Sequence, residues 1–339
     1  MNNSPIWPNT SMAANISLPN TSVFTRGEDI ALKFFYVLVS FAAVIGNSGV
    51  CFIILNDKKI QNTVNLLLLN LSISDIISAI AVYPYLFLDI SKTNLKGTGA
   101  NLMCGFTEGL TLFFAASLVN LLTLSVLSLS RYMLINHPTK HKWRVKKHSV
   151  KWICVFTWTV GISLLIPSGV SFHYNSENKI CWRRWAKGII LVLYFIATMV
   201  IAFLIPLCTL TFTYISTIHT LWFKKSLQRL QRTNSQTSVQ SSRKRISILL
   251  GMLIVVFLVC WSPFGIYWLL STALNYFPDT VEGQGKMIRI TRYTILIALL
   301  NTCLDPLVYA YSNRQITNGA KRTLRRKGTI NTVEPTATE

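Results

Sequence analysis

The chain contains little charge, and most of that charge has one sign. Only 13% of its 339 residues are charged, about half the share that is usual for a soluble domain. Twelve acidic residues stand against 33 Lys and Arg residues, and 51% of the chain is apolar. Such a composition argues against an ordinary soluble globular domain and favours a protein that lives in a membrane.

Sequence motifs for catalysis are also missing. The sequence contains no His/Cys cluster with the spacing of metal ligands, no nucleophile motif and no phosphate-binding loop. It has no internal repeat with paired broken helices, as secondary transporters have. No basic n-region and apolar h-region begin the chain, so the first apolar stretch is expected to direct its own insertion. We predict that the protein is not an enzyme.

What the sequence has in abundance is long apolar stretches. About 20 apolar residues in a helix, rising 1.5 Å each, match the hydrocarbon thickness of a bilayer. Seven stretches reach that length, and the rest of the chain is too short to cover them all. The sequence therefore predicts an all-α membrane protein, a seven-transmembrane helix bundle. The stretches are Ile30–Leu55, Val64–Leu88, Leu102–Ile135, Val150–Val170, Gly188–Ile218, Ile246–Leu274 and Tyr293–Tyr311.

Most of the basic residues lie in four polar segments that alternate with the stretches. Positive charge is retained on the cytoplasmic side of a membrane, which predicts an external N-terminus and an internal C-terminus. We expect an extracellular tail over residues 1–29, the bundle over 30–312 and a cytoplasmic segment over 313–339. Basic loops beside a bilayer attract anionic lipid, so the lipid bilayer is an expected partner and nucleic acid is not.

Four Asn-x-Ser/Thr acceptors lie in the first segment, which predicts a glycosylated tail facing the outside of the plasma membrane. They are Asn9, Asn15, Asn20 and, least favoured because it adjoins the chain end, Asn2. Five of the seven cysteines lie within apolar stretches, where they act as small buried hydrophobes. Cys104 and Cys181 lie toward the outer side, an oxidising compartment, so we predict a disulfide between them. The bridge could shape a vestibule or act only as a stability staple.

Several polar side chains lie deep within the apolar stretches. Asp75 and Asp305 are carboxylates there, and Asn47, Asn120 and Asn301 are amides. Polar groups inside a bilayer normally turn inward toward one another or toward water. A lone Asn is more often a hydrogen bond between helices, but two carboxylates need more than that. If the two acids converge, protonation or a small monovalent cation between them relieves their repulsion.

Prolines within the later stretches predict kinks. Pro263 follows Cys260, Trp261 and Ser262, so a large ring lies close to one predicted kink, and Pro306 follows Asp305 directly. A kink can be a packing adaptation or a moving hinge. The ring of Trp261 beside Pro263 favours a hinge that responds to whatever fills the cavity above it.

Short motifs, each different, lie in a fixed order along the seven stretches. They are Gly46-Asn47, Leu69–Asp75, Ser130-Arg131-Tyr132, Trp158, Pro206 with Tyr214, Cys260–Pro263 and Asp305–Tyr309. Any one of them is a weak signal. Together and in this order they resemble the helix signatures of the rhodopsin-like (class A) G-protein-coupled receptors. The resemblance extends over all seven stretches.

The resemblance implies that an extracellular ligand drives nucleotide exchange on a heterotrimeric G protein, with arrestin as a further candidate partner and residues 313–339 forming a short cytoplasmic helix 8 and a tail. The implied ligand-pocket residues are Phe113, Phe114, Trp261 and Leu299. The implied G-protein-coupling residues are Arg131, Tyr132, Tyr214 and Tyr309. The implied switch residues are Pro263, Asp305 and Pro306. A sodium ion is implied as an allosteric ligand of Asp75, Asn120, Asn301 and Asp305.

Four departures from the family pattern bear on function. Ser130 replaces the usual acidic residue before Arg131, and Arg243 is basic where some members place a glutamate. Cys104 lies further from Arg131 than is usual. Helix 8 is weakly marked, with Ile316 where an aromatic residue is common. Ser130 predicts either ligand-independent signalling or a non-signalling relative that has lost coupling.

Residues in the outer half of the predicted bundle indicate the class of ligand. Phe113 lies where amine receptors carry an aspartate, which argues against a monoamine. Leu299 replaces the lysine that holds retinal, so a faint opsin likeness near Cys104 does not make the chain a retinal pigment. A basic rim suits an anionic ligand or a peptide carboxylate, but it could equally be a rim that only faces solvent or lipid headgroups. Its residues are Arg183, Arg184, Lys187, Lys286, Arg289 and Arg292, set against Asp89, Glu108, Asp279 and Glu282. We predict that the protein is a receptor for a peptide ligand. The alternative is that it is an ion transporter or channel.

Overall fold

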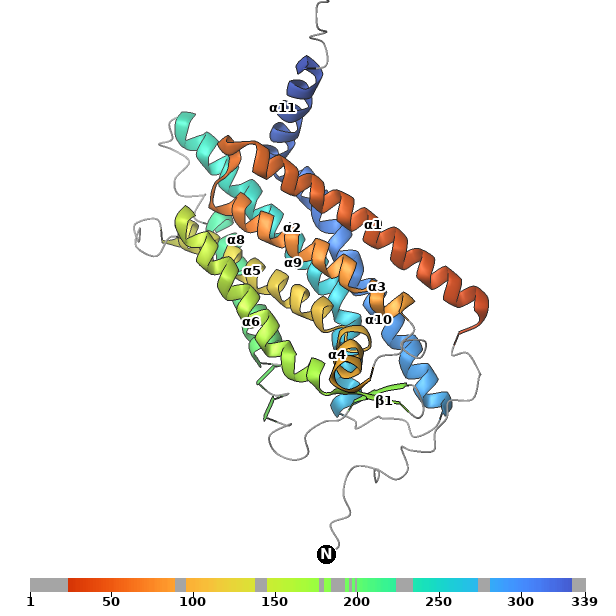
Figure 1. The fold of residues 1–339 in the computed structure, drawn as a ribbon. Helices are drawn as coiled ribbons and strands as arrows, with labels where there is room; N and C mark the ends of the chain where they lie inside the picture. The colour runs from red at the N-terminus through yellow and green to blue at the C-terminus, as the bar shows by residue number, and fades with distance from the viewer. Residues whose placement is uncertain are drawn as a thin grey trace, which may run out of the picture.

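Seven helices long and apolar enough to cross a membrane lie among the described ranges of the computed structural model, which confirms the predicted bundle (Figure 1). The structure describes residues 24–88, 96–137, 145–176, 180–183, 193–194, 197–198, 200–223, 234–273 and 281–330. The predicted glycosylation sites Asn2, Asn9, Asn15 and Asn20 lie outside these ranges. The spanning helices are α1 (Arg26–Asn56), α2 (Thr63–Ala81) continued by α3 (Tyr83–Phe87), α5 (Thr111–Asn136), α6 (Val150–Val170), α8 (Ile205–Phe223) after a π-helical turn (Val200–Leu204), α9 (Asn234–Ala273) and α10 (Val281–Ser312).

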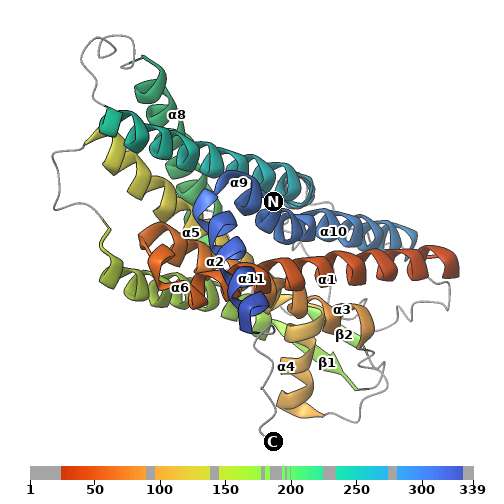
Figure 2. The same cartoon turned by 90° about the horizontal axis from the view of Figure 1, so that it is seen from above.

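Helix α1 begins at a capping box. The Thr25 hydroxyl accepts a hydrogen bond from the Glu28 amide, and the Glu28 carboxylate accepts one from the Thr25 amide. Two of the otherwise unsatisfied amide groups at the helix start are thereby paired. Along its length α1 packs on α2 and α10, and seen from above α10 lies between α1 and α9 (Figure 2).

The third apolar stretch is not the single continuous helix that the sequence predicted. Its outer part is a separate helix, α4 (Gly97–Thr107), and the chain turns at Glu108–Leu110 before α5 begins. Leu110 has φ of 46°, the only positive φ among the described residues other than glycine. A β-carbon on Gly105 would collide with the carbonyl of Gly169 in α6, so α4 and α6 approach backbone to backbone. This turn accommodates the extra residues between Cys104 and Arg131.

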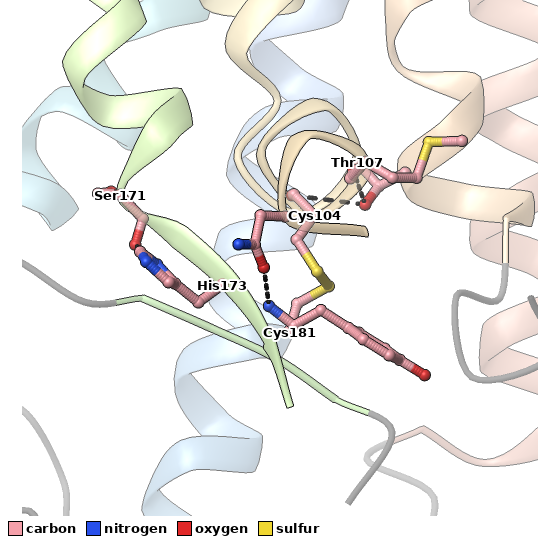
Figure 3. The surroundings of a disulfide bond; sticks show 8 residues. Cys104, Thr107, Ser171, His173 and Cys181 are labelled. Atoms are coloured by element: carbon pink, nitrogen blue, oxygen red, sulfur yellow. Dashed lines mark hydrogen bonds between the residues drawn. A yellow bond between two sulfur atoms is a disulfide. The ribbon is translucent and has the colours of Figure 1, made fainter. Parts of the chain in front are cut away.

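A small unit with its own apolar core lies at the same end as the start of α1. The antiparallel strands β1 (Phe172–Asn175) and β2 (Ile180–Arg183) pair Tyr174 with Cys181. Cys181 forms the predicted disulfide with Cys104 of α4, with 5.5 Å between the α-carbons (Figure 3). The Tyr174 amide donates to the Asn101 side chain of α4 at 2.8 Å. We call this the disulfide end of the bundle.

The opposite end carries α11 (Arg314–Ile330), so we call it the α11 end (Figure 1). Helix α11 lies where the resemblance implied a short helix 8, although the sequence marks it only weakly. Ile316 is buried against the bundle although it is not aromatic. Arg322 forms an ion pair with Asp57 at 2.7 Å, and Gly319 lies against Ile53 so closely that a β-carbon would come within 2.9 Å of it.

Candidate functional site

A buried polar cluster lies at the centre of the bundle, where α2, α5 and α10 converge. Asp75 of α2 and Asp305 of α10 are each 1% exposed, and their carboxyl groups lie within hydrogen-bonding reach of each other. The Asn120 amide of α5 donates to an Asp75 oxygen at 2.7 Å. Asn301 is buried in the same region of α10. The structure thus brings together Asp75 and Asp305, which the family resemblance implied would share one site.

This cluster has more acceptors than donors. Four buried oxygen atoms have no hydrogen-bond donor among the described residues: one each on Asp75, Asn120, Asn301 and Asp305. An unsatisfied buried acceptor is costly in a low-dielectric interior. Carboxylate and amide oxygens are the ligands that hard cations prefer. The donor set therefore fits a small monovalent cation with oxygen ligands.

Above the polar cluster, toward the disulfide end, lies a stack of aromatic rings. Trp261 of α9 stacks on Phe113 of α5 and on Phe257 one helical turn away, with 5.8 Å between ring centroids in both pairs. Phe114 and Phe264 close the stack from the sides. Such offset and edge-on arrangements are the favoured geometries of aromatic pairs.

The four residues predicted to line a ligand pocket lie in one apolar cluster. Phe113 and Leu299 are fully buried there, and Phe114 and Trp261 are partly buried. The four side chains therefore pack against one another in the interior of the bundle. Phe257 and Phe264 were missed from the sequence, although their positions four residues before and three after Trp261 place all three on one helix face.

Two helices, α9 and α10, each contain an internal proline, the residue at which the sequence predicts a kink. Pro306 in α10 has no amide hydrogen for the carbonyl of Thr302, four residues earlier. The buried Asn47 amide of α1 donates to that carbonyl at 2.8 Å. Pro263 in α9 likewise leaves the carbonyl of Val259 without its helical donor, and the Ser262 hydroxyl donates to it at 3.3 Å.

Residues predicted to couple to a G protein lie toward the α11 end, on three helices. Arg131 of α5 is buried, at 9% exposed, and Tyr309 of α10 is completely buried. Tyr132 contacts His137 and packs on Phe212 of α8. Ser130 is partly exposed. The side chain of Arg243 lies outside the described part of the chain.

Tyr214 of α8 reaches directly onto α9. A β-carbon on Gly251 would collide with the Tyr214 ring and hydroxyl, so only glycine allows this close approach. The sequence signalled Tyr214 but not Gly251, because a glycine inside an apolar stretch does not reveal which neighbour approaches it. The contact fixes the present spacing of α8 and α9.

The profile of the rhodopsin family of seven-transmembrane receptors matches residues 46–309, which include the kinks, the polar cluster and the aromatic stack. The chain therefore belongs to this receptor family and is a multi-pass membrane protein.

Individual relatives span most of the chain. A QRFP-like peptide receptor of Branchiostoma floridae is 26% identical over 89% of this chain and 78% of its own length. An RYamide receptor of Drosophila melanogaster is 25% identical over 88% of this chain and 64% of its own. The neuropeptide Y receptor type 6 of Mus musculus is 23% identical over 82% of this chain and 76% of its own.

Proposed function

We propose that the protein senses an extracellular peptide and passes the signal to a heterotrimeric G protein. The observation that carries the proposal is the aromatic stack around Trp261, which lies within one helical turn of Pro263 in α9. In this proposal the disulfide end faces the outside of the plasma membrane, in keeping with the positions of the basic segments. Relatives named as receptors for peptides support the ligand class.

The proposed mechanism is a shift between two arrangements of the bundle. A ligand that binds above the stack more tightly in one arrangement biases the equilibrium toward it. Movement of Trp261 turns α9 about Pro263 and separates it from α8 at the Tyr214–Gly251 contact. A groove beside Arg131 and Tyr132 then accepts a helix of the G protein, and arrestin is a further candidate for the same groove. Tyr214 and Tyr309 stabilise the open form.

We propose that a sodium ion at the polar cluster opposes this movement. The cation would be held by Asp75 and Asp305 together with Asn120 and Asn301, whose free oxygens support the assignment. It relieves the repulsion between the two carboxylates only while the helices are close, so it favours the closed arrangement. Raising sodium at constant ionic strength should lower basal signalling. Asp75→Asn should remove that sensitivity, and an Asp75→Asn variant that keeps the full sodium effect would exclude this cluster.

The experiment that tests the proposed function is a screen of peptide libraries on cells expressing the chain, read out by G-protein dissociation. At least one peptide should give a saturable response that Trp261→Ala reduces at unchanged surface expression. Responses equal to those of mock-transfected cells would contradict it. Ion flux in the same cells separates the receptor from a channel or transporter.

Ser130 supports one second candidate, a receptor relative that binds ligand without coupling. In that case the same cells would bind a labelled peptide, with no G-protein dissociation at any concentration. Restoring the acidic residue by Ser130→Asp would then be the first variant in which to look for a recovered response.

A further inference from the structure

The aromatic ring of Phe24 lies close to two arginines at the disulfide end. Phe24 lies just before the Thr25 cap of α1, and its side chain is 5% exposed. The guanidinium of Arg292 lies 5.1 Å from the ring centroid and that of Arg289 lies 5.5 Å from it. Tyr293 contacts the ring from the side, at 6.5 Å between centroids. Cations over an aromatic face are attracted by its negative quadrupole.

Two carboxylates that follow Phe24 closely in the sequence pair with the same two arginines. Glu28 pairs with Arg289 at 3.0 Å, and Asp29 pairs with Arg292 at 3.2 Å. The cradle, defined here as Arg289, Arg292 and Tyr293 with Tyr85, therefore holds an aromatic ring together with carboxylate groups. Arg292 also lies over the ring of Tyr85, at 5.4 Å.

The pairing of Arg292 is incomplete. Asp29 accepts from one terminal nitrogen of the guanidinium, whereas the Nε–H of Arg292 is buried and has no partner among the described residues. A guanidinium binds a carboxylate best through two parallel hydrogen bonds. The Nε–H of Arg292 is therefore a donor with which a further carboxylate could pair once Phe24 has moved.

The cradle is continuous with the aromatic stack. Phe24 belongs to the same apolar cluster as Phe113 and Leu299, against which Trp261 packs. The Tyr36 hydroxyl, fully buried in α1, donates to the Arg292 carbonyl at 2.7 Å and fixes the backbone beneath the cradle. A change of occupant at the cradle thus reaches Trp261 through packed side chains alone.

We propose that the cradle is a subsite for an aromatic residue that carries a carboxylate, such as the carboxyl-terminal aromatic residue of a peptide, and that Phe24 occupies it in the absence of that ligand. The proposal rests on the proposed peptide-receptor function and names the chemistry of one end of the ligand. The chain's own Phe24, flanked by Glu28 and Asp29, is the evidence for what the cradle accepts. A ligand of this chemistry displaces Phe24 and pairs its carboxylate with the Nε–H of Arg292.

The test uses the full-length receptor in lipid nanodiscs and a minimal probe. N-acetyl-L-phenylalanine supplies the ring and the carboxylate, and N-acetyl-L-phenylalanine amide supplies the ring alone. Binding at millimolar concentrations is measured by saturation-transfer NMR. The acid should bind the Phe24→Ala variant about tenfold more tightly than it binds the wild type, because the competing ring is gone. The amide should bind the same variant about tenfold more weakly than the acid.

Two double variants locate the effect. Adding Arg292→Gln to Phe24→Ala should abolish the preference for the acid. Adding Arg26→Gln, which removes an exposed arginine from the first turn of α1, should leave the preference unchanged. Phe24→Leu repeats the measurement with an apolar side chain in place if Phe24→Ala lowers the melting temperature.

Equal binding of acid and amide, equal binding to wild type and Phe24→Ala, or no binding to a folded Phe24 variant would each overturn the proposal. In those cases Phe24 only fastens α1 to α10. None of these measurements requires signalling, so they stand apart from the peptide screen. A receptor that responds to peptides but shows no acid preference would keep the proposed function and lose this subsite.

Discussion

The two kinked helices differ in how they satisfy the carbonyl group that proline frees. In α10 the donor comes from another helix: Asn47 of α1 reaches the Thr302 carbonyl in the buried interior. In α9 the donor is on the same helix: Ser262 reaches the Val259 carbonyl at an exposed position. The α10 helix is thus bonded to a neighbouring helix at Pro306, whereas the bond at Pro263 lies within α9 itself. We call the kink at Pro263 self-contained for this reason.

Packing around the two prolines also distinguishes a tightly held α10 from a less tightly packed α9. Gly46 of α1 lies against the Pro306 ring, where a β-carbon would come within 2.9 Å of the ring. A β-carbon on Gly265, two residues after Pro263, would meet no atom closer than 3.9 Å. We infer that α1 and α10 form the fixed part of the bundle and that α9 is the part able to turn. A helix can turn at a hinge if the hydrogen bonds around the hinge are kept during the movement.

The largest expected effect tests the fixed part. Asn47→Ala removes two buried hydrogen bonds, to the carbonyls of Ala43 and Thr302, and leaves the latter without a donor. Loss of buried partners should cost about 2–4 kcal/mol of unfolding free energy. A lower melting temperature of the purified receptor in detergent measures it.

Asn56→Ala is the matched control for that variant. Asn56 also lies on α1 and donates to the carbonyl four residues earlier, Phe52, but it is exposed and reaches no other helix. Its replacement should change the melting temperature little, because surface substitutions cost within about 0.5 kcal/mol. Equal losses in the two variants would mean that the bond to α10 contributes nothing.

A smaller effect is expected at the glycine beside the same kink. Gly46→Ala forces its β-carbon against the rigid Pro306 ring, and such overpacking costs about 1–3 kcal/mol. Gly49→Ala, three residues on, meets nothing within 4 Å and should stabilise α1 by up to about 1 kcal/mol. Thermal unfolding of both variants would show opposite signs. Two stabilised proteins would contradict the tight contact between α1 and α10.

The sequence predicted the seven spans and the Cys104–Cys181 bridge, because these follow from hydropathy and compartment, and the family resemblance implied that Asp75 and Asp305 share one site. It could not predict the contacts that depend on how helices rotate and approach. Gly251 beneath Tyr214 is one of these contacts, and the arginines around Phe24 are another. The turn at Leu110 was missed for a different reason: an apolar residue within an apolar stretch carries no signal of a positive φ.

If α9 is the mobile part, the interaction that holds Arg131 is expected to oppose its movement, as the proposed sodium ion does. An acidic neighbour would hold that arginine by an ion pair, whereas Ser130 offers only an uncharged acceptor, so the attraction between opposite charges is missing. We expect appreciable ligand-independent signalling, which Ser130→Asp should lower about tenfold, the equivalent of about 1.4 kcal/mol. Ser130→Asn, similar in size but uncharged, should lower it much less. Basal G-protein dissociation equal to that of mock-transfected cells and unchanged by Ser130→Asp would refute this expectation.

The smallest effect is expected at the self-contained kink. Ser262→Ala removes the hydroxyl that donates to the Val259 carbonyl, but this bond is long, at 3.3 Å, and exposed. The unfolding free energy should therefore change by less than about 0.5 kcal/mol, several-fold below the effect of Asn47→Ala. Melting temperatures measured side by side in the same detergent make the comparison direct. A loss as large as that of Asn47→Ala would mean that α9 is fastened at its kink as firmly as α10, and the turning helix would have to be sought elsewhere in the bundle.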